Sequence, residues 1–65
     1  MSEQKKKDAL IMVVDDELLV LKVTSIIIAK MGYRPISFSK SKKALEYYRD
    51  HFSEIDLVLL DMVMP

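Results

Sequence analysis

Two short apolar runs in the chain indicate buried strands. The first, Leu10 to Val14, is continuous, contains β-branched residues and is followed by acids. The second, Leu57 to Leu60, leads directly into Asp61. Runs of this length without polar interruption are typical of strands that are buried on both faces, as in a parallel sheet. We therefore predict two fully buried strands at these positions.

The segment between residues 17 and 31 is predicted to be a helix, although its β-branched residues favour a strand. The length of the segment and the residues at its two ends favour a helix. Asp15 or Asp16 can act as the N-cap, and Gly32 stands where a left-handed residue ends a helix. An apolar stripe at helical spacing then consists of Leu19, Val23, Ile26 and Ile27.

A short strand and a second helix are predicted next. The segment from Arg34 to Phe38 alternates in polarity and contains Pro35, which has no N–H to donate, so we expect this strand at a sheet edge. Ser39 or Ser41 can cap the second helix. The apolar residues of this helix repeat at helical spacing and are Ala44, Leu45, Tyr48 and Phe52.

The order of elements is therefore strand, helix, edge strand, helix, strand. This alternation predicts an α/β fold with parallel strands, right-handed crossovers and helices on the faces of the sheet. With the Pro35 strand at the edge, the two apolar runs are neighbours and the strand order is 2-1-3. We expect a flavodoxin-like βαβαβ half domain, in which ligands bind beyond the carboxyl ends of the strands.

Composition and charge narrow the classes of protein further. The 65 residues include no Cys, which excludes disulfides and thiolate metal sites, and ten basic residues balance ten acidic ones. No overall charge therefore points to nucleic acid or to an anionic membrane. The apolar stretch from Leu18 to Met31 is shorter than the ~20 apolar residues of a membrane span. We expect a polar leader at residues 1–8, one domain at residues 9–65 and a cytoplasmic location.

Three acids follow the two predicted neighbouring strands. Asp15 and Asp16 come after the first strand, and Asp61 comes after the third. Adjacent strands lie about 4.8 Å apart, so these carboxylates are expected to share a small volume and to need a proton or a cation. Oxygen ligands without His or Cys favour Mg²⁺, which would allow Asp61 to attack a phosphoryl donor. Each acid also has a purely structural interpretation, as a helix cap or as a strand end.

Four segments, taken together, carry a family resemblance. They are VVDDE from Val13, GYRPISFS from Gly32, ALE from Ala44 and DLVLLDMVMP from Asp56. In this order they resemble the first half of a two-component response-regulator receiver domain, over about residues 10–65. The specific combination is the double acid after the first strand together with Asp-x-x-Met-Pro after the third, and it is an argument by analogy.

The resemblance implies roles for four positions. Asp61 would accept the phosphoryl group, and Asp16 and Asp61 would ligate Mg²⁺ directly. Asp15 would act through a coordinated water, and the backbone carbonyl of Val63 would complete the protein ligands. The donor would be a phosphohistidine on a sensor histidine kinase or a phosphotransfer protein, so His51 is expected to be an ordinary surface residue. The implied function is phosphorelay signal transduction, with self-catalysed phosphorylation at most rather than enzyme activity.

The resemblance also implies that part of the family's machinery has no counterpart here. Receiver domains are about twice this long, and their second half supplies a Ser or Thr hydroxyl and a Lys that bind the phosphoryl group. No position of this sequence matches either group. We therefore expect a truncated receiver with impaired phosphorylation.

Other functions fit the sequence less well, with one exception. A phosphatase with an Asp nucleophile would have a second Asp where Val63 stands, and glycine-loop nucleotide sites need more glycines than Gly32. The stronger alternative is a non-catalytic receiver fragment that associates with itself. An unpaired third strand and uncovered sheet faces would then predict a homo-oligomer.

Overall fold

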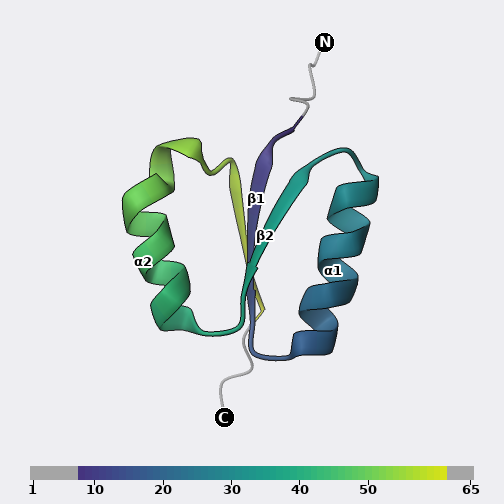
Figure 1. The fold of residues 1–65 in the computed structure, drawn as a ribbon, viewed down its shortest axis with the longest axis horizontal. Coiled ribbons are helices and arrows are strands. Elements are labelled where there is room, and N and C mark those ends of the chain that lie inside the picture. The colour runs from purple at the N-terminus through teal and green to yellow at the C-terminus, as the bar shows by residue number, and fades with distance from the viewer. Residues whose placement is uncertain (1–7, 62–65) are drawn as a thin grey trace.

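The computed structural model describes residues 8–61, which form a three-stranded parallel sheet with a helix on each face (Figure 1). The central strand is β1 (Leu10–Asp15). It pairs in parallel with β2 (Arg34–Phe38) on one side and with β3 (Leu57–Asp61) on the other. The predicted order 2-1-3 and the edge position of the strand that contains Pro35 are therefore confirmed.

Two helices connect the strands. Helix α1 (Leu18–Lys30) links β1 to β2, and α2 (Ser41–His51) with the short 3₁₀ turn η1 (Phe52–Glu54) links β2 to β3. The two helices lie on opposite faces of the sheet (Figure 1). Within residues 8–61, neither helix combines the length and the apolar character that a membrane crossing requires.

Strand β1 supplies the core on both faces of the sheet, since all six of its residues are buried, as predicted for residues 10–14. Because successive side chains point to opposite faces, β1 divides its side chains between the two helices. Ile11 and Val13 pack with Leu21 and Ile28 of α1. The other cluster contains Met12, Val14 and Ala44, with Ile36, Phe38, Ile55 and Val58 packed against it.

The end of α1 is fixed by a glycine in the left-handed region, as the sequence predicts. Gly32 has φ 93°, and its N–H donates to the Ala29 carbonyl at 3.0 Å. The Tyr33 N–H donates to the Ile28 carbonyl at 3.2 Å, and the Tyr33 side chain packs against the cluster that contains Ile28. These paired bonds and the apolar contact are the Schellman arrangement, which satisfies the last carbonyls of a helix and turns the chain into β2.

The apolar stripe predicted for α1 is present but faces away from the sheet. The helix buries Leu21 and Ile28 against β1, whereas the stripe residues are between 48% and 72% exposed. The exposed stripe consists of Leu19, Val23, Ile26 and Ile27. Helix α1 is therefore apolar on two opposite sides, and the structure covers only one of them.

The prediction that β3 is fully buried is wrong. Leu57 is 50% exposed, Leu59 is 39% exposed and Leu60 is 70% exposed. Helix α1 contacts β1 and β2, which leaves its side of β3 largely uncovered. On the other face, Val58 packs into the α2 cluster while Leu60 stays exposed.

The predictions for α2 are correct in position and wrong in detail. Its N-cap residue is Lys40, with no side-chain cap hydrogen bond, so neither Ser39 nor Ser41 caps the helix. Among the apolar residues predicted at helical spacing only one is buried, namely Ala44, while Leu45, Tyr48 and Phe52 are exposed. The helix packs on the sheet through Ala44 and through Tyr47, whose ring centroid lies 5.4 Å from that of Phe38 in β2.

Replacing Gly32 by Ala should lower the free energy of unfolding by about 1–2 kcal/mol, because an L residue is strained at positive φ. An added Cβ would meet nothing within 4 Å, so the loss would be conformational rather than steric. The measurement is urea unfolding followed by circular dichroism. As a control, Lys30→Ala changes an exposed residue with helical backbone and should shift stability by less than about 0.5 kcal/mol. Equal stability of Gly32→Ala and the wild type would contradict this assignment.

Candidate functional site

The carboxyl ends of β1 and β3 meet at one edge of the sheet, and each strand ends in an acid. Strand register pairs Asp15 directly with Asp61, just as it pairs Val14 with Leu60 one position earlier. Paired residues on adjacent parallel strands have backbones about 4.8 Å apart. Two acids that are 46 positions apart in the sequence thus occupy neighbouring places at the edge where β1 and β3 both end.

The side chain of Asp15 is buried and shapes the turn into α1. It is only 4% exposed, and its Oδ1 accepts a hydrogen bond from the Glu17 N–H at 2.9 Å. The N-cap residue of α1 is Glu17, without a side-chain cap bond, so the prediction of Asp15 or Asp16 as N-cap is wrong. Asp15 instead holds the N–H one position ahead of the helix. A buried carboxylate is costly unless hydrogen bonds or a cation compensate its charge.

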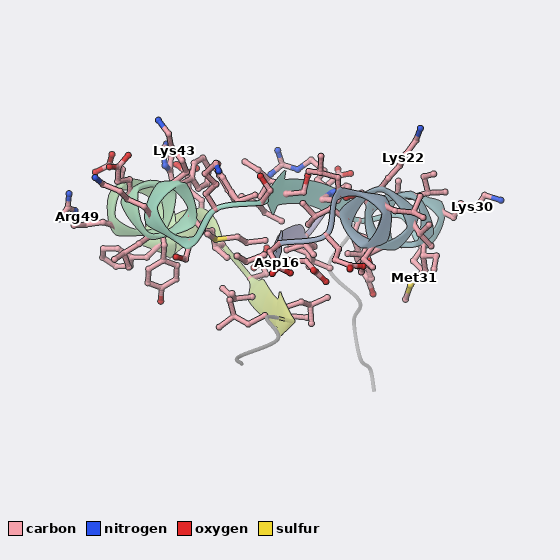
Figure 2. The ribbon with its side chains drawn as sticks, turned by 90° about the horizontal axis from the view of Figure 1, so that it is seen from below. Asp16, Lys22, Lys30, Met31, Lys43 and Arg49 are labelled. Atoms are coloured by element: carbon pink, nitrogen blue, oxygen red, sulfur yellow. The ribbon has the colours of Figure 1, made fainter. Side chains whose placement is uncertain are left out.

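Asp16 differs from its neighbour because it is exposed to solvent. It follows the last residue of β1, between the strand and α1. Figure 2 views the molecule from below and shows Asp16 near the middle, between the two helices and close to the end of the sheet. An exposed carboxylate beside a buried one can bind a cation without closing the edge to water.

The two remaining predicted ligands are only partly covered by the structure. For Asp61 the backbone position is described and the side chain is not, and Val63 lies outside residues 8–61. Among the described side chains, no group of three or more His, Cys, Asp or Glu residues is placed to hold a metal ion. Asp15 and Asp16 supply two oxygen donors of the type that Mg²⁺ prefers, and this ion often takes only one or two carboxylates besides waters.

A further acid, Asp56, fixes the opposite end of β3. Its Oδ2 accepts from the Leu10 N–H at 2.8 Å, and its own N–H donates to the Leu10 carbonyl at 2.9 Å. This double link joins the start of β3 to the start of β1, and it supports the register that pairs Asp61 with Asp15. No local pattern in the sequence signals this link, because its partners are 46 residues apart.

His51 is less exposed than expected and lies away from the acids. It is half-buried, its ring stacks on Tyr47 with centroids 4.0 Å apart, and its Nδ1 lies 3.0 Å from the Tyr47 carbonyl oxygen. It is the last residue of α2, which returns the chain toward the start of β3. His51 thus has a packing role at the end of the sheet opposite the acids.

An apolar groove of about 650 Å³ runs between α2 and the sheet. Val14 and Leu60 line it, so it begins next to the residues that precede Asp15 and Asp61. Its other lining residues are Met12, Ser41, Lys42, Ala44, Leu45, Tyr48 and Val58. None of these is an acid, so the groove and the acid edge are adjacent but chemically distinct.

Comparisons with known proteins add no assignment, since no protein-family model, curated protein or solved structure matches the chain.

The role of Asp15 in the turn can be tested without any metal. In metal-free buffer Asp15→Ala should lower the free energy of unfolding by about 1.5–3 kcal/mol, because the Glu17 N–H loses a charged acceptor. Asp15→Asn keeps an oxygen acceptor and removes the buried charge, so its stability should lie closer to the wild type. Thermal unfolding of the three proteins gives the order. If Asn is as destabilising as Ala, the hydrogen bond is not what Asp15 contributes.

Proposed function

We propose that this chain is a receiver-type phosphorelay module, in which Asp61 accepts a phosphoryl group from a phosphohistidine. The observation that supports it best is the register that pairs Asp61 with Asp15 at the carboxyl ends of adjacent parallel strands. In doubly wound sheets this is the edge at which ligands bind. The partner is a sensor histidine kinase or a phosphotransfer protein, and a cytoplasmic location is part of the same proposal.

The proposed reaction is an in-line transfer between an imidazole and a carboxylate. A carboxylate oxygen of Asp61 attacks the phosphorus atom and forms an O–P bond. The P–N bond of the phosphohistidine breaks, and the imidazole nitrogen leaves with the electron pair and takes up one proton from the solvent. The product is an aspartyl phosphate and a free histidine, so the transfer needs no further co-reactant.

Clustered acids would oppose this attack, because they repel both one another and the anionic donor. Mg²⁺, when bound, neutralises this charge. Asp16 and Asp61 would bind the ion directly, and Asp15 would bind it through a water. The carbonyl of Val63 would be the remaining protein ligand. The burial of Asp15 and the exposure of Asp16 suit this division, since the exposed acid is the more accessible to an ion from solvent.

A second candidate function is a non-catalytic module that associates with itself. It is favoured by β3, which lies at an edge of the sheet within residues 8–61 and exposes Leu57, Leu59 and Leu60. An edge strand with uncovered apolar side chains is a site where another chain can add. The two candidate functions differ in the role of Asp15, Asp16 and Asp61. The phosphorelay module uses these acids to bind a metal ion and a phosphoryl group, whereas the self-associating module uses them only in local structure such as the turn into α1.

Magnesium should stabilise the protein through the acids at the carboxyl edge. A ligand that binds only the folded state raises the unfolding temperature, so millimolar Mg²⁺ should raise that of the wild type. Asp16→Ala should weaken Mg²⁺ binding by about 10-fold or more, as measured by calorimetric titration. The matched control is Asp50→Ala, which removes an exposed acid from α2. If Asp16→Ala and Asp50→Ala bind Mg²⁺ like the wild type, the metal assignment is wrong.

Phosphorylation should occur at Asp61 and should be slow. Incubation with Mg²⁺ and an acyl phosphate should add one phosphoryl group in a small fraction of the molecules, as seen by intact mass. No position among these 65 residues matches the hydroxyl and the Lys of receiver domains, and a missing donor of this kind typically slows a reaction about 10²–10³-fold. The adduct should vanish in Asp61→Asn and persist in Asp50→Asn. Labelling that survives in Asp61→Asn would overturn the proposal, whereas metal binding without labelling would favour the second candidate.

A further inference from the structure

Helix α1 has more apolar surface than its place in the described structure uses. Only Lys22 and Lys30 are charged among its 13 residues. Leu21 and Ile28 face β1 and are buried, while Leu19, Val23 and Ile27 follow one another at intervals of four on the outer side. Apolar sides of a helix in a folded protein usually pack against other elements. Within residues 8–61, the outer side of α1 is therefore an apolar surface that is open to a partner.

The α1 stripe, namely Leu19, Val23, Ile26 and Ile27, faces away from the sheet, and its spacing of four continues from Ile27 to Met31. Figure 2 shows Lys22 and Met31 on opposite sides of α1, with Met31 on the side of the view where β3 lies and Lys30 pointing away from the sheet. Leu57 and Leu59 are paired with Ile11 and Val13, so they lie on the α1 face of the sheet. The outward stripe of α1 (the ridge) and the uncovered leucines Leu57 and Leu59 of β3 (the floor) thus lie on the same side of the sheet.

We infer that two copies of this chain associate through this face, with the α1 helices antiparallel across a two-fold axis. The inference deepens the second candidate function by naming its surface, and it does not depend on phosphorylation. In a two-fold interface each copy offers the same patch to the other, so a chain that has both a ridge and a floor can cover both at once. Rows of side chains spaced by four residues are the ridges through which helices most often pack.

Charge favours a second copy in the antiparallel orientation. Glu17 stands directly before the start of α1, and Lys30 is the last residue of α1. Both side chains are exposed. When two α1 helices run in opposite directions about the middle of the stripe, Lys30 of each copy approaches Glu17 of the other. The stripe between these ends contains no charge. A parallel arrangement would instead bring like charges together at both ends.

The available area also matches what a dimer needs. Transfer data imply on the order of 100 Å² of apolar surface for a fully exposed aliphatic side chain. The four stripe residues together with Leu57, Leu59 and Met31 are between 39% and 72% exposed, so they offer roughly 350–400 Å² in total. One side of a standard interface covers about 800 Å², of which somewhat more than half is apolar. The stripe and the β3 leucines therefore supply most of the apolar part of such an interface.

The first test is the association state of matched variants in sedimentation velocity over a range of concentrations. The wild type should be a reversible dimer, and Ile27→Lys should weaken the dimer by at least about 10-fold. The control is Leu45→Lys, which places the same charge at an exposed leucine on α2, on the other face of the sheet. Circular dichroism verifies that both variants stay folded, which is expected because both positions are exposed.

Covalent capture and charge exchange test the geometry. Because the chain contains no Cys, Val23→Cys provides a single thiol at the middle of the stripe, and it should form a disulfide-linked dimer that Leu45→Cys does not form. Glu17→Lys and Lys30→Glu should each weaken association by about 3-fold or more, and the double exchange should restore it.

Each outcome separates the inference from the proposed functions. A wild type that stays monomeric at all concentrations overturns both the dimer and the self-association candidate, and it leaves phosphorylation untouched. A dimer that Leu45→Lys disrupts and Ile27→Lys does not would retain self-association and overturn the α1 surface. Failure of the double exchange to restore association would overturn the antiparallel arrangement.

Discussion

The structure depends on the burial of β1 between two helices and two strands. All six residues of β1 are buried, and its alternate side chains form the centre of both apolar clusters. Its backbone pairs with β2 and β3, so the same strand sets the register of the whole sheet. Without β1 neither helix would have a surface to cover, and Asp15 and Asp61 would not be neighbours.

Much of this arrangement could be predicted because it is encoded locally. The apolar run from Leu10 to Val14, the lack of a donor at Pro35 and the glycine at the end of α1 each have one favoured structural solution. The strand order follows from these three features. The acid edge follows in turn, because parallel strands that are neighbours must end on the same side.

The sequence could not predict which helix or strand buries which face of its neighbours. The apolar runs at residues 10–14 and 57–60 have similar sequences, yet only the first has a helix over each face. The exposure of β3 could therefore not be predicted from its amino-acid sequence. The α1 stripe has the correct period, but periodicity does not tell which of two apolar sides faces the sheet. The Asp56 link to Leu10 is a contact between distant residues, for which no local pattern exists.

The divalent-cation site proposed at the carboxyl ends of β1 and β3 can be tested directly by NMR. Mn²⁺ prefers the same oxygen ligands as Mg²⁺, and its unpaired electrons broaden nearby amide signals in NMR spectra. The measurement is a titration of the ¹⁵N-labelled protein with substoichiometric Mn²⁺. We expect selective loss of the Asp15, Asp16 and Asp61 amide signals, while those of Leu10 and Asp56 at the opposite end of the strands stay unchanged. Broadening centred on Leu10 and Asp56, or spread evenly over the chain, would contradict it.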